Sequence, residues 1–254
     1  ITISGLTNSS TITLTGVATV AGVSNYTITA TGICDAKTIA GTITVKPEAD
    51  ITVSTGTNNI EGCINIALTS PVGYTVVGTS TATIEGLATG LTITAGTGVG
   101  SSTSNGIITL TNLSASNTFT ITGTPTIAGS STYSITVQGT CSTKTITGTI
   151  LVKPAADITI TSGSSTTVNC VNVTLTSPVG YTVVGTSTAT ISGLPAGLTV
   201  TPGTGVGLSI TNGIITLSNL SASNTFTITG TPTIAGLSTY SITIQGTCST
   251  KTIT

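Results

Sequence analysis

The stretch Asn117-Thr-Phe-Thr-Ile-Thr122 decides the fold class. Phe119 and Ile121 alternate with threonines, so the apolar and hydroxyl side chains point to opposite faces of an extended chain, as in a half-buried strand. The stretches from Tyr133 to Val137 and from Lys144 to Val152 alternate in the same way. Threonine, which fills about a quarter of the sequence, suits the outer face because its β-branched side chain favours extended backbone. No long apolar pattern of helical period is found, so the sequence predicts an all-β chain.

Glycine, proline and asparagine divide the sequence into short strands. Asn105-Gly106, Ala128-Gly129, Pro71-Val-Gly73 and Gly139 are predicted turns. The glycine-rich stretch from Gly96 to Gly100 has no lysine after it and no helix expected beyond it, so it is predicted to be a hairpin and not a phosphate-binding loop. Frequent turns between short strands are typical of an all-β sandwich.

Composition disfavours several classes of function. The 254 residues include five lysines or arginines, six acids, and no His, Met or Trp. Acid–base catalysis near neutral pH mostly uses His or closely placed carboxylates, so we expect no enzyme and no cofactor. A net charge of −1 offers no basic stripe, so we expect neither nucleic acid nor a membrane surface as a partner. Apolar runs are too short for a membrane span, so no membrane insertion is expected.

The chain repeats itself, with a period of about 107 residues that matches the size of one β-sandwich domain. Lys46-Pro47 recurs as Lys153-Pro154, and roughly three quarters of the positions in 48–147 are identical to those in 155–254. Residues 1–47 are therefore predicted to be the C-terminal part of one repeat, 48–154 a complete repeat, and 155–254 a nearly complete one. We expect tandem sandwiches, each adding about 35 to 45 Å of length.

Five cysteines lie at alternating short and long intervals, in the order Cys34, Cys63, Cys141, Cys170, Cys248, which leaves two disulfide schemes open. The first pairs Cys63 with Cys141 and Cys170 with Cys248 inside repeats, and leaves Cys34 unpaired because its partner would lie upstream. The second pairs Cys34 with Cys63 and Cys141 with Cys170 across the junctions, and leaves Cys248 for a later repeat. We favour the first, because a sandwich can bring an early strand and the turn before the last strand together. Without His or a Cys-x-x-Cys motif, a zinc site is not expected.

The second long repeat carries a family resemblance in Gly193-Leu-Pro-Ala-Gly-Leu-Thr199, in Ile228-Thr-Gly-Thr-Pro-Thr-Ile-Ala-Gly236 and in Tyr240-Ser-Ile-Thr243. These motifs resemble the immunoglobulin-like repeats of very large bacterial surface proteins. With the added cysteines, the chain resembles the variant in giant adhesins of the Bacteroidota, including gliding-motility adhesins exported by the type IX secretion system. The resemblance implies tandem Greek-key β-sandwich domains that act as spacers, one for each repeat of about 107 residues.

Only weak candidates for a metal site exist. Glu48, Asp50 and Asp157 follow the Lys-Pro pairs, where cadherin-like modules place calcium ligands. Calcium takes six to eight oxygen ligands, and the second junction has Ala155 in place of Glu48. We therefore expect no metal at these positions.

The expected function is structural: stalk or spacer repeats of a long extracellular adhesin or filament at the bacterial cell surface, with a role in gliding motility or attachment. The expected partners are neighbouring repeats of the same chain, together with surface glycans or other adhesin chains. Two alternatives stay open, an adhesive module that binds glycan or protein and a self-assembling surface fibre, since uncharged threonine-rich edge strands are poorly protected against pairing.

Overall fold

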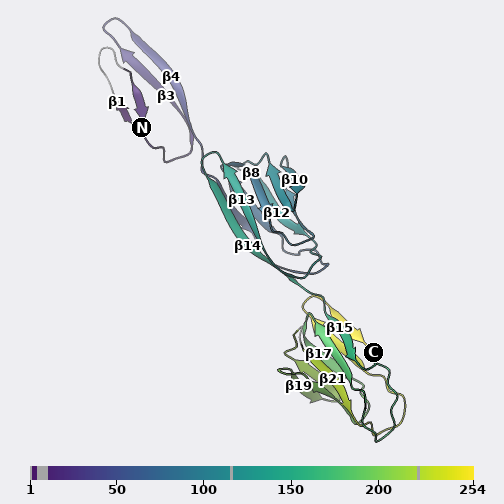
Figure 1. The fold of residues 1–254 in the computed structure, drawn as a ribbon. Helices are drawn as coiled ribbons and strands as arrows, with labels where there is room; N and C mark the ends of the chain where they lie inside the picture. The colour runs from purple at the N-terminus through teal and green to yellow at the C-terminus, as the bar shows by residue number, and fades with distance from the viewer. Residues whose placement is uncertain (1, 5–10, 115–116, 222–223) are drawn as a thin grey trace.

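A computed structural model describes residues 2–4, 11–114, 117–221 and 224–254. Every regular element in these ranges is a strand, so the all-β prediction is confirmed. The chain forms three bodies that follow one another end to end in sequence order (Figure 1). The second and third are β-sandwiches of the immunoglobulin-like type, as predicted.

The middle repeat packs a four-stranded sheet against a six-stranded one. The smaller sheet has the order β5 (Asp50–Thr55), β7 (Val72–Val77), β12 (Thr118–Gly123), β9 (Leu91–Ala95). The larger has the order β10 (Gly100–Ser104), β11 (Ile107–Thr111), β8 (Thr79–Glu85), β13 (Gly129–Gly139), β14 (Thr143–Lys153), β6 (Asn59–Cys63). All neighbours in the two sheets are antiparallel except β14 and β6, which run parallel.

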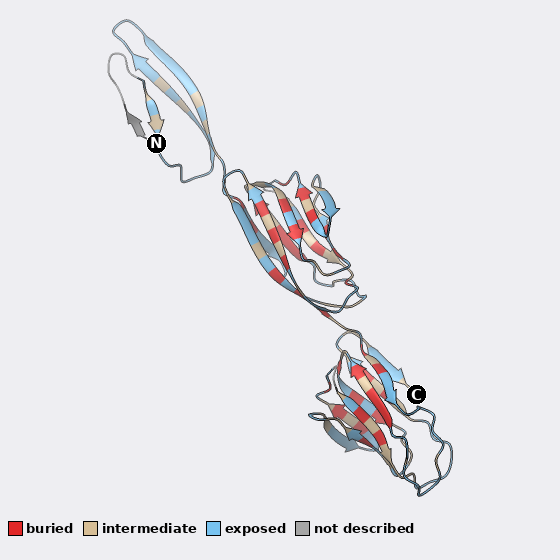
Figure 2. Cartoon of the chain, in the orientation of Figure 1, coloured by how far each residue is buried: buried red, intermediate tan, exposed pale blue. Residues whose placement is uncertain are grey.

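The core of the middle repeat lies between its two sheets and runs from Ala49 to Val152 (Figure 2). Phe119 and Ile121 of β12 are buried, as the alternation predicts. The ring of Phe119 stacks on that of Tyr74, with centroids 5.5 Å apart. Alternation with period two therefore places the apolar residues of each strand between the sheets and the threonines outside.

The third repeat has the same plan and a separate core that runs from Ala156 to Ile244. One sheet has the order β15 (Asp157–Ser162), β16 (Val179–Val184), β21 (Thr225–Gly230), β18 (Leu198–Pro202). The other has the order β19 (Gly207–Thr211), β20 (Ile214–Ser218), β17 (Thr186–Ser192), β22 (Ser241–Gly246), β23 (Thr250–Ile253). Its last strand is much shorter than β14, and residues 166–170, which correspond to β6, form no strand.

The described residues of 1–47 form two antiparallel strand pairs, β1 (Thr2–Ser4) with β2 (Thr13–Thr15) and β3 (Gly22–Thr31) with β4 (Ala36–Val45). The long hairpin β3–β4 is largely exposed on both faces (Figure 2). It corresponds in sequence to β13 and β14, which in the middle repeat are covered by the opposite sheet.

The turn predictions are confirmed in part. Asn105 and Gly106, with φ of 50° and 77°, form the two-residue turn between β10 and β11, because both positions need a left-handed conformation. Val72 and Gly73 instead lie inside β7, where a Cβ on Gly73 would come within 2.5 Å of the Thr55 hydroxyl. The Gly96–Gly100 stretch is no hairpin either, since it carries the chain from β9 in one sheet to β10 in the other.

Candidate functional site: the junction between repeats

Three ion pairs and three of the five cysteines lie close to where one repeat meets the next. At the second junction the chain leaves β14 at Lys153 and enters β15 at Asp157, with Pro154, Ala155 and Ala156 between them. Proline has no N–H to continue the sheet and fixes its own φ, so it ends the strand and stiffens the linker. This short linker therefore leaves the two sandwiches little room to separate.

The linker is fastened to the repeat that follows it. The Ala156 N–H donates to the Ser249 hydroxyl over 2.8 Å, and the Ala156 side chain is buried. Gly185, with a φ of 69°, packs so closely on the linker that a Cβ there would lie 2.5 Å from the Ala155 carbonyl oxygen. These contacts make the linker part of the third sandwich.

The first junction repeats these contacts one period earlier. The Ala49 N–H donates to the Ser142 hydroxyl over 2.8 Å, and Ala49 is buried. A Cβ on Gly78 would collide with the Glu48 carbonyl oxygen. The Lys46 ammonium also donates to the Thr140 hydroxyl over 3.4 Å, from the repeat before the junction to the repeat after it. Both junctions are thus built to one plan.

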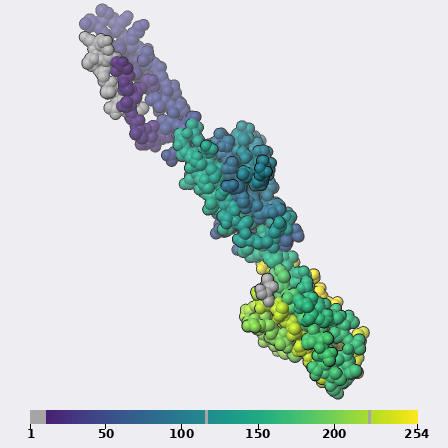
Figure 3. All heavy atoms as spheres, viewed as in Figure 1, coloured from purple at the N-terminus to yellow at the C-terminus, as the bar shows by residue number. Residues whose placement is uncertain are grey.

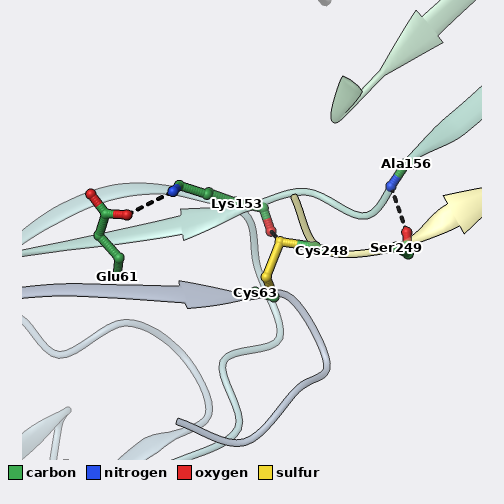
Figure 4. The surroundings of a disulfide bond; sticks show 6 residues. All are labelled: Glu61, Cys63, Lys153, Ala156, Cys248 and Ser249. Atoms are coloured by element: carbon green, nitrogen blue, oxygen red, sulfur yellow. Dashed lines mark hydrogen bonds and ion pairs between the residues drawn. A yellow bond between two sulfur atoms is a disulfide. The ribbon is translucent and has the colours of Figure 1, made fainter. Parts of the chain in front are cut away.

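A disulfide crosses the second junction (Figure 4). It joins Cys63, the last residue of β6, to Cys248, with 5.5 Å between the Cα atoms and 185 residues between them in sequence. We call the segment Thr247–Ser249, between β22 and β23, the junction loop of the third repeat; Thr140–Ser142 is that of the middle repeat. The Cys248 sulfur lies 3.7 Å from the Lys153 carbonyl oxygen, so the bond runs beside the linker. Two covalent connections therefore join the repeats.

Both predicted disulfide schemes are wrong, and the strand order gives the reason. Cys63 lies opposite Lys153 at the end of β14, because β6 runs parallel to β14. Cys141 precedes the start of β14, and eleven residues of strand span about 35 Å. The intradomain pair Cys63–Cys141 would thus join opposite ends of one sandwich. Within the third repeat Cys170 is a free thiol, and Cys248 is bonded to Cys63 of the middle repeat.

The cross-junction alternative fails for the same reason. Cys34 precedes β4, whose ten residues carry the chain to the first junction, and Cys63 lies at the far end of the middle repeat from that junction. The structure leaves Cys34, Cys141 and Cys170 as exposed free thiols. The spacing of the cysteines could not identify the observed pair. Equivalent cysteines recur at the same interval in each repeat, so the spacing does not tell which two repeats are bonded.

Three ion pairs lie near the junctions. Lys153 contacts the Glu61 carboxylate over 2.6 Å, between β14 and β6 (Figure 4). Lys251 contacts Asp157 over 2.5 Å, and the equivalent pair of the middle repeat, Lys144 and Asp50, is 3.9 Å apart. The hydrogen bond from the Lys251 ammonium holds the pKa of Asp157 below its ordinary value. The side chains of all three pairs are partly exposed to solvent, so each pair contributes little to stability by itself.

Two of the three candidate calcium ligands form ion pairs with lysines. Asp50 and Asp157 face ammonium groups, and Glu48 lies in the first linker. Within the ranges that the structure describes, no three His, Cys, Asp or Glu side chains gather as a metal site would require. That the junctions bind no metal stays a prediction.

A pocket of about 380 Å³ lies in the third repeat, lined among others by Leu175, Leu198, Ile234 and Thr254. It lies beside the short strand β23, on the side that β6 and β14 cover in the middle repeat. No helix in the described part of the chain is long and apolar enough to cross a membrane.

Comparisons with known proteins return structures and no sequence families. No family model and no curated protein matches the chain. Similar solved structures include the IG1 and IG2 domains of DIP-gamma, with 11% identity over 81% of this chain and 95% of that one and a TM-score of 0.42. A titin Ig tandem has 12% identity over 81% and 94%, with a TM-score of 0.30. Domains 4 and 5 of the S-layer protein SbsC have 17% identity over 56% and 62%, with a TM-score of 0.29. Matches at this level say nothing about what the chain binds.

Proposed function

We propose that the chain is a segment of an extracellular stalk, in which tandem immunoglobulin-like sandwiches hold functional parts of a longer protein apart. The observation that carries this proposal is the disulfide Cys63–Cys248, which joins one repeat to the next. A bond in this place limits bending between the repeats, and it adds a covalent path beside the linker along which tension can pass. Both properties serve a spacer.

The surface between the junctions supports the same function. Threonine hydroxyls on neighbouring strands bond to each other, as in Thr52 with Thr75 and Thr136 with Thr145, at 2.8 and 2.9 Å. The same pairs recur one period later as Thr159 with Thr182 and Thr243 with Thr252. These hydroxyls form hydrogen bonds with one another and give the sandwich a polar surface without charge. Such a surface suits a spacer, whose role is to separate other parts of the protein.

We place this stalk on a bacterial surface adhesin, of the kind that serves attachment or gliding motility. The support is the resemblance of the turn and strand motifs in the second long repeat, such as Gly193–Thr199. A structural disulfide also fits an oxidising, extracellular compartment. Neighbouring repeats are the partners that the junction contacts support; glycans and other chains rest on the resemblance.

Small-angle X-ray scattering of the whole chain tests the proposal. Three bodies in line (Figure 3) form a rod on the order of 100 Å long, with a radius of gyration of about 30 Å. A compact chain of this length has a radius of gyration of about 18 Å. A measured value near that of the compact chain contradicts a stalk. A glycan array probed with the same protein tests the adhesive alternative, and saturable binding there would replace the spacer function with a binding one.

A further inference from the structure

The two junctions differ in the state of their junction-loop cysteines. Cys248 is bonded to Cys63, whereas Cys141, one period earlier, is a free thiol. Both sulfurs lie against the same position of the linker. The Cys141 sulfur lies 3.8 Å from the Lys46 carbonyl oxygen, and that of Cys248 lies 3.7 Å from the Lys153 carbonyl oxygen. Cys141 is therefore positioned at the first junction as Cys248 is at the second.

The other half of the bond is also repeated. In the middle repeat the chain turns after Cys63, with the Ile66 N–H donating to the Cys63 carbonyl over 3.2 Å and Asn65 to that of Pro125 over 2.8 Å. After Cys170 the Val173 N–H donates to the Cys170 carbonyl over 3.2 Å, and Asn172 to that of Pro232 over 2.8 Å. Asn65 and Asn172 share a left-handed φ, 59° and 60°. Cys170 is thus held on the third repeat by the same turn that holds Cys63.

We propose that Cys141 and Cys170 are half-sites for disulfides to further copies of this repeat. Cys141 pairs with a cysteine one period before Cys63, in a segment that would complete the first repeat. Cys170 pairs with the cysteine one period after Cys248, in the junction loop of a following repeat. Every bond then spans 185 residues, and every repeat is joined to both neighbours. Cys34, one period before Cys141, pairs by the same rule with a repeat further upstream.

The proposal rests on the proposed function only in taking further repeats to adjoin this segment. Each of these cysteines would bond to a cysteine thiol of an equivalent repeat. The junction brings the two thiols together because it fixes where each of them lies. At a junction of two complete repeats the two sulfurs meet beside the Lys-Pro linker, as Figure 4 shows for Cys63 and Cys248. Cysteines elsewhere in the same repeat lie a strand length away.

The bond forms by thiol–disulfide exchange with an oxidant such as oxidised glutathione. One cysteine thiolate attacks the glutathione disulfide, which forms a mixed disulfide and releases one glutathione thiolate. The second cysteine thiolate attacks the cysteine sulfur of that mixed disulfide and releases the other glutathione. The protein loses two protons and two electrons, and two glutathione thiols receive them.

A lengthened chain tests the proposal. A second copy of residues 48–107 is fused before Ile1, which takes the place that Ile108 has in the middle repeat and so completes the first repeat. The protein is refolded in a glutathione redox buffer, the free thiols are alkylated, and the peptides are mapped without reduction. We expect the added copy of Cys63 to be bonded to Cys141, and the native Cys63 to Cys248. Cys34 and Cys170 should be alkylated.

Variants fix the assignment. Cys141→Ser should leave the added cysteine alkylated, whereas Cys34→Ser should leave the bond unchanged. A bond between the added cysteine and Cys34, or quantitative alkylation of Cys141 while Cys63–Cys248 is present, overturns the proposal. Absence of the Cys63–Cys248 bond from the lengthened chain also overturns the proposal, because no disulfide would then span 185 residues. Scattering of the same lengthened chain reports its shape separately, so a rod with free thiols would refute the disulfide rule and leave the stalk standing.

Discussion

At the residue scale, the core of the middle repeat contains two tyrosines in contact, a contact that no simple sequence pattern predicts. The hydroxyls of Tyr74 and Tyr133, from opposite sheets, lie 2.5 Å apart inside the core. The side-chain oxygen and the carbonyl of Asn58 accept from them at 3.0 and 3.1 Å. Burial raises the pKa of both phenols, so the pair stays neutral in the folded repeat. In the third repeat Ser165 replaces Asn58, and Tyr240 is only half-buried.

Removing one hydroxyl tests this contrast. We expect Tyr133→Phe to lower the free energy of unfolding of the middle repeat by about 1 to 2 kcal/mol, because buried acceptors lose their donor. The matched change Tyr240→Phe should cost the third repeat less, since solvent reaches that site. Native-state hydrogen exchange followed by mass spectrometry of peptides resolves the two repeats. Equal losses in both would show that Asn58 adds nothing.

The Asp157–Lys251 pair predicts a pH dependence. The pKa of Asp157 lies below its ordinary value of 3.8 in the folded repeat, so the ionised form favours folding. Its contribution is present above pH 3.8 and is lost as the pH falls through the depressed pKa. Asp157→Asn should therefore reduce the acid sensitivity of the third repeat by a small amount, since the pair is exposed. Melting curves between about pH 2 and 6 measure it. Asp50→Asn is the matched control at the wider pair, whose two atoms lie 3.9 Å apart.

At the element scale, the two long repeats share most residues yet differ at one edge. In the middle repeat β14 buries Ile150 and Val152 and pairs with β6. In the third repeat the last strand ends at Ile253, and the corresponding edge holds the pocket of about 380 Å³. The segment that corresponds to β6, residues 166–170, shares only its cysteine with Asn59–Cys63 and has no long final strand to pair with.

Appending Gly148-Thr-Ile-Leu-Val-Lys-Pro154 after Thr254 should complete the third sandwich. Burying the added isoleucine and valine side chains is worth about 1.5 to 3 kcal/mol each, so slow exchange should extend to residues 166–170. Hydrogen exchange of the third repeat measures the gain. The control carries threonine at both apolar positions of the appended segment and should gain little. Equal protection with either segment would show that the pocket is not a strand site.

At the scale of the whole molecule, stiffness is decided at the junctions. Each linker is short and fastened to the following sandwich through Ala49 or Ala156, and the second junction has a disulfide as well. We therefore expect freer bending at the first junction, where Cys141 is a free thiol.

Breaking the disulfide should increase bending. We expect Cys248→Ser to broaden the distribution of angles between the middle and third repeats in negative-stain images, because the linker alone then joins them. Cys141→Ser, in the equivalent loop of the middle repeat, removes a free thiol and should leave that distribution unchanged. If Cys248→Ser particles are as straight as the unmodified chain, the linker contacts set the angle and the disulfide is dispensable for stiffness.

The sequence by itself determined the strands, the repeat period and the sandwich class. These depend on alternation and identity along the chain, as in Asn117–Thr122, and such local signals are read without knowing the partners. Tertiary structure alone decided which cysteines meet. The parallel pairing of β6 with β14 carries Cys63 to the far end of its repeat, where the nearest thiol belongs to the next repeat. The cysteines recur at the same spacing from repeat to repeat, so the sequence does not show which of them are bonded. The direction of β6 relative to β14 decides the pairing.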